Sequence, residues 1–194
     1  LDILNFFIMS NKYEVVIGLE IHAQLATASK MFCGCVNTRI IPNLGDSNRL
    51  ANNPELDSDP PNSRTCPICM GNPGTLPVIN KKALEWTYLF GLALNCDIAP
   101  QFNFERKQYF YPDLPKAYQI TSQTTPPLIG GYLDIEIDSR GSYTDELGYK
   151  HCTIEHIHLE EDAGKLIHAD NRGSSADSRG NYSLVDLNRA GTPL

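Results

Sequence analysis

Apolar and polar residues alternate along residues 13–25, a pattern typical of a β-strand. Because successive strand side chains point to opposite faces, Gly18, Glu20 and His22 would share one face. A glycine lets another group approach the backbone closely, and a glutamate and a histidine two residues apart can reach one ion. The pattern also fits a half-exposed strand whose two polar side chains lie in water.

The same periodicities predict the other elements. Apolar residues at helical spacing predict an α-helix over residues 80–94, capped by Asn80 or a neighbour. Alternating residues predict further strands over 130–137, 151–160, 165–169 and 182–188. Segments rich in Asn, Asp, Ser or Gly are predicted loops at 42–64, 138–149 and 171–181. No P-loop or dinucleotide-binding glycine motif occurs, so any nucleotide site is of another kind.

Three consecutive acids, Glu160, Glu161 and Asp162, follow an apolar run at the end of a predicted strand. His158 would share a face with Glu160, whereas Glu161 would point the other way unless the chain turns at the following Ala-Gly. Adjacent acids repel one another and disfavour a strand. The chain must therefore leave them in water or give them a cation, and both a solvated strand end and a metal site remain open.

Four of the six cysteines form two close pairs, Cys33-Gly-Cys35 and Cys66-Pro-Ile-Cys69. Each spacing brings two thiolates within reach of one tetrahedral zinc ion, and the proline and the following glycine suit a zinc knuckle over residues 32–71. A site of four thiolates is closed, so such a zinc would hold the fold together and not catalyse. The alternative is four reduced, buried cysteines without a metal.

Basic and aromatic residues interleave in residues 104–119. Arg106, Lys107 and Lys116 lie among three tyrosines and a phenylalanine, and two prolines argue against a helix there. This mixture suits a planar ligand that carries phosphate, such as a nucleotide. It also fits an aromatic-rich loop packed on the core with solvated lysines.

The composition is that of an ordinary globular chain, with 41% hydrophobic and 20% charged residues. The net charge of −7 argues against binding nucleic acid through overall charge, although a local basic face stays possible. The apolar run at residues 1–8 is too short to cross a bilayer and lacks the flanks of a signal peptide, which favours the cytosol and reduced cysteines. We expect residues 1–12 to be a disordered extension and 13–194 to be part of a longer domain.

Six motifs, in order, resemble those of the B-subunit family of aspartyl/glutamyl-tRNA(Asn/Gln) amidotransferases. They are Val16-Ile-Gly-Leu-Glu-Ile-His22, Phe32-Cys-Gly-Cys35, Cys66-Pro-Ile-Cys69, Tyr109-Phe-Tyr-Pro-Asp-Leu-Pro-Lys116, His158-Leu-Glu-Glu-Asp-Ala-Gly-Lys165 and Ser183-Leu-Val-Asp-Leu-Asn-Arg-Ala-Gly-Thr-Pro-Leu194. The resemblance spans nearly the whole chain but only the front part of the family's protein.

This resemblance implies a ligase that uses ATP to phosphorylate the side-chain carboxylate of Glu-tRNA(Gln) or Asp-tRNA(Asn). Ammonia from a partner amidase (A) subunit would then displace the phosphate, and a small C subunit would complete a cytoplasmic heterotrimer. The implied fold is α+β, a mostly antiparallel sheet cradle similar to the glutamine synthetase catalytic domain, with a small zinc-binding knuckle.

The resemblance also implies roles for residues. Glu20, His22, Glu160 and Glu161 match the family's magnesium-binding positions, with a further acid expected beyond Leu194. Arg106, Lys107 and Lys116 become candidates for contacts with ATP phosphate or acyl-tRNA. The chain departs from the family pattern in a longer loop between the cysteine pairs and at three positions: His156 in place of Arg, Gln108 of Asn and Ala117 of Gly.

Two other functions stay open from the sequence. The chain could be a zinc-stabilised scaffold that binds tRNA or a partner and has no kinase activity of its own. It could also be a stand-alone carboxylate–amine ligase acting on a small substrate, which would turn over without tRNA or amidase.

Overall fold

The computed structural model describes residues 16–37, 59–136, 149–168 and 183–194. The expected extension at 1–12 and the predicted loop at 171–181 lie outside these residues, as do most of the loops predicted at 42–64 and 138–149. None of the helices described is long and apolar enough to cross a membrane.

The predicted helix is confirmed as α2, Lys81–Ala93. The Asn80 side chain caps it by accepting hydrogen bonds from the backbone N–H groups of Lys82 (2.9 Å) and Ala83 (3.2 Å). The same amide donates to the carbonyl of Ser29 at 2.9 Å. The cap therefore both starts the helix and fixes it to the segment that leads into the first cysteine pair.

Every strand pair in the described residues is antiparallel, as the α+β prediction requires. A three-stranded sheet has the order β1-β4-β7, and three two-stranded pairs are β2-β3, β5-β6 and β8-β9. The strands are β1 Asp97–Ile98, β2 Glu105–Gln108, β3 Tyr118–Thr121, β4 Leu128–Ile129, β5 Tyr132–Glu136, β6 Tyr149–Thr153, β7 His156–Ile157, β8 Lys165–His168 and β9 Ser183–Asp186.

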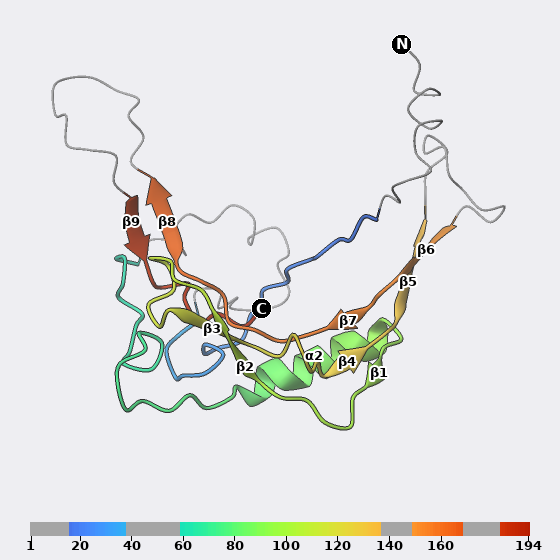
Figure 1. Ribbon diagram of the computed structural model, residues 1–194, viewed down its shortest axis with the longest axis horizontal. Coiled ribbons are helices and arrows are strands. Elements are labelled where there is room, and N and C mark those ends of the chain that lie inside the picture. The colour runs from blue at the N-terminus through green and yellow to red at the C-terminus, as the bar shows by residue number, and fades with distance from the viewer. Residues whose placement is uncertain (1–15, 38–58, 137–148, 169–182) are drawn as a thin grey trace, which may run out of the picture.

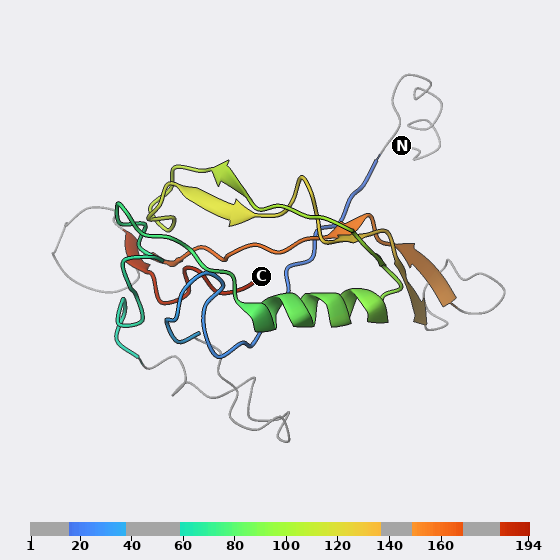
Figure 2. The same ribbon diagram turned by 90° about the horizontal axis from the view of Figure 1, so that it is seen from below.

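These elements form an open curve. The β5–β6 and β8–β9 pairs rise at its opposite ends, and α2 lies with the three-stranded sheet at the base between them (Figure 1). Seen from below, α2 and the β2–β3 hairpin flank the long segment that contains β7 (Figure 2). The core lies where helix, hairpin and cysteine segment meet, and consists of Met31, Phe32, Ala83, Ile120 and Leu159.

The prediction of one strand over 151–160 is wrong in its middle. The partner strand bends at Gly130–Gly131, where φ is +65° and +110°. A Cβ on Gly131 would lie 2.5 Å from the Sγ of Cys96, so a side chain does not fit there. Because of this bend, β6 pairs with β5 while β7 pairs with β4, and the chain between them changes partner.

The strand predicted over 13–25 is also wrong in its described part, since residues 16–25 form no strand. The apolar residues Val16, Ile17, Leu19 and Ile21 are each more than 80% exposed. A strand needs a neighbouring strand for its backbone hydrogen bonds, and within the described residues none pairs with this segment. The strands predicted over 130–137, 165–169 and 182–188 are confirmed as β5, β8 and β9 with slightly shorter bounds.

Candidate functional site

The two cysteine pairs come together. The four Sγ atoms of Cys33, Cys35, Cys66 and Cys69 all lie within 4.8 Å of one another, and no cysteine forms a disulfide. Tetrahedral zinc–thiolate bonds of about 2.3 Å place sulfurs roughly 3.8 Å apart, so the cluster has the size that a zinc site needs. In the described ranges this is the one group of three or more His, Cys, Asp or Glu side chains arranged to hold an ion.

Local geometry already favours negative charge on one sulfur. The thiol of Cys33 donates a hydrogen bond to the sulfur of Cys69. This bond, the backbone N–H of Cys66 at 3.1 Å and the charge of Lys30 together lower the pKa of Cys69 to about 4, although burial acts in the opposite direction. The same hydrogen bond raises the pKa of Cys33 above its ordinary value, as burial also does. Burial raises the pKa of Cys35 to about 11. Cys69 is therefore the sulfur of the cluster on which negative charge is most favourable.

The acidic triplet lies in the interior. Its backbone runs between β3 and the segment 192–194, with a bridge from Thr121 to Glu160 and another from Glu161 to Pro193. Glu160 and Glu161 are only 6% and 2% exposed. The alternative of a solvated strand end is thus wrong, and each acid instead contacts its own partner in the protein.

Glu160 faces His158, as strand alternation predicted, with 3.4 Å between Oε2 and Nε2. Burial favours the neutral acid, but the hydrogen bond and charge of His158 and the charge of Lys107 outweigh it and lower the pKa of Glu160. Glu160 is therefore a buried carboxylate whose ionised form is favoured by the contact with His158 and by the charge of Lys107.

Glu161 points to the opposite face. Its Oε1 lies 2.5 Å from the Nζ of Lys116 and accepts the backbone N–H of Ile120 at 3.0 Å. Lys116 is itself only 8% exposed at its side chain. The pair lines a small cavity together with Cys33 and Cys69. Glu161 thus belongs to the side of the molecule that holds the cysteines, away from Glu160.

Asp162 has a third set of partners. It accepts a hydrogen bond from the side-chain amide of Gln24, and its Oδ2 lies 3.6 Å from the Nε of Arg189. It also accepts the backbone N–H of Ala163 at 2.8 Å, which is the turn expected after the acids. Asp162 therefore anchors the end of the N-terminal segment and the loop after β9.

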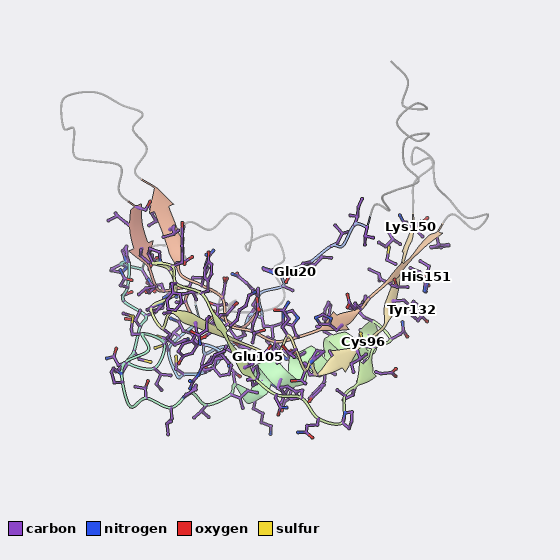
Figure 3. All side chains as sticks on the ribbon, viewed as in Figure 1. Glu20, Cys96, Glu105, Tyr132, Lys150 and His151 are labelled. Atoms are coloured by element: carbon purple, nitrogen blue, oxygen red, sulfur yellow. The ribbon has the colours of Figure 1, made fainter. Side chains whose placement is uncertain are left out.

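Glu20 and His22 lie on the exposed segment that leaves the body before Gln24. Their side chains approach each other to 3.5 Å and are 67% and 58% exposed. Figure 3 shows Glu20 on this extended segment, apart from the hairpin residues Tyr132 and His151. The described structure does not assemble Glu20 and His22 with the acidic triplet. The four residues assigned to magnesium do not fit one ion as they are arranged here, and that assignment stays a prediction.

The chain matches the family described as the GatB/GatE catalytic domain over residues 15–194. The chain belongs to this family. It is 51% identical over 183 residues to the B subunit of aspartyl/glutamyl-tRNA(Asn/Gln) amidotransferase from Geotalea uraniireducens, covering 94% of this chain and 32% of that protein. The protein of the same name from Geobacter sulfurreducens is 50% identical over 182 residues, which are 94% of this chain and 32% of that protein. The one from Thermoanaerobacter sp. is 47% identical over 183 residues, which are 94% of this chain and 31% of that protein. The chain thus spans about a third of the length of these relatives.

The basic residues singled out in this GatB/GatE-family chain do not share one face. Arg106 and Lys107 are neighbours on β2 and therefore point to opposite sides. The guanidinium of Arg106 lies 5.1 Å from the ring centre of Tyr118, whereas the charge of Lys107 acts on Glu160. Lys116 is committed to Glu161. Of the three, Lys107 is the cation that lies near Glu160.

Sequence reasoning missed Lys30. Its side chain is fully buried beside the cysteine cluster. The usable signal was the position of this lysine, directly before the apolar Met31-Phe32 and three residues ahead of Cys33. A lysine in a stretch that is buried needs a partner, and a nearby pair of metal-binding cysteines is a candidate for that partner.

Proposed function

We propose that this chain is part of the B subunit of a glutamine-dependent tRNA amidotransferase. The observation that carries the proposal is the family match over residues 15–194, with about 50% identity to curated B subunits over 94% of the chain. In this function ATP phosphorylates the side-chain carboxylate of Glu-tRNA(Gln) or Asp-tRNA(Asn). Ammonia from a partner amidase (A) subunit then displaces phosphate, leaving the amide on the tRNA.

The proposal also covers the rest of the domain and the partner subunits. Residues 13–194 form the front part of a catalytic domain whose complete fold is similar to that of glutamine synthetase. The complete subunit works in the cytoplasm with an A subunit and a small C subunit. The relatives' threefold greater length and the open, curved arrangement of antiparallel pairs (Figure 1) support a domain that continues beyond these residues.

The cysteine cluster is proposed to bind structural zinc. Four thiol ligands within 4.8 Å of one another, and a pKa of Cys69 lowered to about 4, support this. A bound zinc would crosslink two segments that are distant in sequence and so add to folding stability. Metal analysis of the purified full-length protein tests it: about one equivalent of zinc is expected, and a small fraction of an equivalent after exposure to zinc would reject the site.

The reaction is tested in the full-length subunit with its partners. Glu160→Ala and Glu20→Ala are expected to abolish transamidation of misacylated tRNA, while glutamine hydrolysis by the amidase survives at least in part. Glu85→Ala, on the exposed face of α2, is the matched control and should leave product formation unchanged. Undiminished product from both test variants would remove these carboxylates from the reaction and favour the scaffold function.

A further inference from the structure

Lys30 is a lysine in an unusual place. Its side chain is fully buried, although an ammonium group loses several kcal/mol of hydration on burial unless it is compensated. Among the described residues no carboxylate lies within ion-pair distance of its Nζ. The buried side chain of Lys116, by comparison, has Glu161 for this purpose. The charge of Lys30 must be balanced by something else.

The contacts of Nζ show what this is. Nζ donates to the backbone carbonyls of Arg64 at 2.8 Å and Leu187 at 3.3 Å, and it lies 3.8 Å from the Sγ of Cys69. An ammonium group has three donors and no acceptor, and here it has three acceptors around it. Of these three acceptors, only the sulfur of Cys69 can carry a negative charge.

The charges of a filled cluster call for such a neighbour. Zinc with four thiolates carries a net charge of −2, and at a buried ligand such as Cys69 cations or N–H dipoles must offset that charge. The backbone N–H of Cys66 donates to Cys69 at 3.1 Å, and Lys30 supplies a full positive charge to the same sulfur. The positive charge of Lys30 and the negative charge of the zinc-bound thiolates therefore compensate each other.

We propose that Lys30 is the counter-cation of a zinc–tetrathiolate centre and sets its affinity for the metal. The inference rests on the proposed zinc site. Because its other two bonds go to Arg64, shortly before the second cysteine pair, and to Leu187, directly after β9, Lys30 also holds both segments against the cluster. It is a positioning residue for the ligands and takes no part in the reaction.

The test compares zinc affinity in the full-length protein by competition with a chromophoric chelator. Lys30→Met and Lys30→Gln are expected to weaken zinc binding about 10- to 100-fold, the range typical for groups that hold metal ligands in place. Lys82→Met removes an exposed lysine of α2, which contacts a carboxylate instead of a sulfur, and should leave zinc affinity within about threefold of the parent. Cobalt(II) spectra should still show four thiolates in variants that bind metal.

The outcomes separate the two proposals. Parent protein that binds no zinc overturns the metal site and the role of Lys30 with it. Parent-like affinity in the two neutral variants, or an equal loss in Lys82→Met, overturns only the role of Lys30. Should the neutral variants fail to fold even in excess zinc, Lys30→Arg decides: a folded, zinc-binding protein supports a requirement for charge, and failure of this variant as well refutes it.

Discussion

Replacing Lys116 by Met should measure how much the stability of the fold depends on the cation that pairs with the buried Glu161. The ammonium of Lys116 lies 2.5 Å from Glu161, and the two side chains are 8% and 2% exposed. Methionine keeps most of the volume of the lysine stem but removes the charge. Glu161 would then be a buried carboxylate whose remaining partner among the described contacts is the backbone N–H of Ile120 at 3.0 Å.

The expected magnitude follows from this geometry. Breaking a buried ion pair by removing one partner costs about 3–5 kcal/mol, because the other charge stays buried without compensation. Whole domains are stable by only about 5–15 kcal/mol, so the single variant should be close to unfolding. The double variant Lys116→Met/Glu161→Gln no longer buries an unpaired charge. It should lose less than the sum of the two single losses, with a coupling of about 1–3 kcal/mol.

Urea denaturation of the four proteins in this cycle, followed by circular dichroism, measures the free energies of unfolding. The matched control is the exposed pair Lys82–Glu85 on α2, at 2.8 Å, where Lys82→Met should cause no measurable change because solvent screens exposed pairs. Additive losses in the cycle, or a loss at Lys116 no larger than that at Lys82, would refute the reasoning.

Three further predictions rest on single contacts. Because the pKa of Glu160 is lower in the folded protein, its ionised carboxylate stabilises the fold above about pH 4.3, and this stabilisation is lost as pH falls through the folded-state pKa. The difference in unfolding free energy between the parent and Glu160→Gln should therefore shrink from about pH 6 to about pH 2 in urea titrations. Asn80→Ala removes the cap of α2 and should cost about 1–2 kcal/mol in the same assay. Gly91→Val should cost about 1–3 kcal/mol, since a Cβ there would lie 2.4 Å from Leu128, whereas Gly34→Ala, with open space around it, should cost much less.

Local chemistry made several elements predictable. The helix followed from its cap at Asn80 and its apolar spacing, and the cysteine cluster followed from two short spacings that few folds use for anything but a shared ligand. The face shared by His158 and Glu160 followed from the alternation of strand side chains. In each case the information lies within a few consecutive residues.

What the sequence did not predict depends on residues distant along the chain. The break between β6 and β7 arises from Gly130–Gly131 on the partner strand. The alternation at residues 16–22 is that of a strand, but it cannot say whether a pairing strand lies alongside. The partner of Glu161 is Lys116, which lies far earlier in the sequence and which no local pattern identifies.

The partners of the triplet change the case for magnesium. Buried acids implied a cation, and the protein itself provides Lys107 near Glu160, Lys116 for Glu161 and Arg189 for Asp162. A metal is therefore not needed to explain why these acids are buried. An ion that bound Glu161 would have to break a buried pair, at a cost of about 3–5 kcal/mol, whereas at Glu160 it would displace a longer contact of 3.4 Å. Of the two buried glutamates, Glu160 is therefore the one whose carboxylate a ligand reaches at the lower energetic cost, whereas Glu161 stabilises the fold through Lys116.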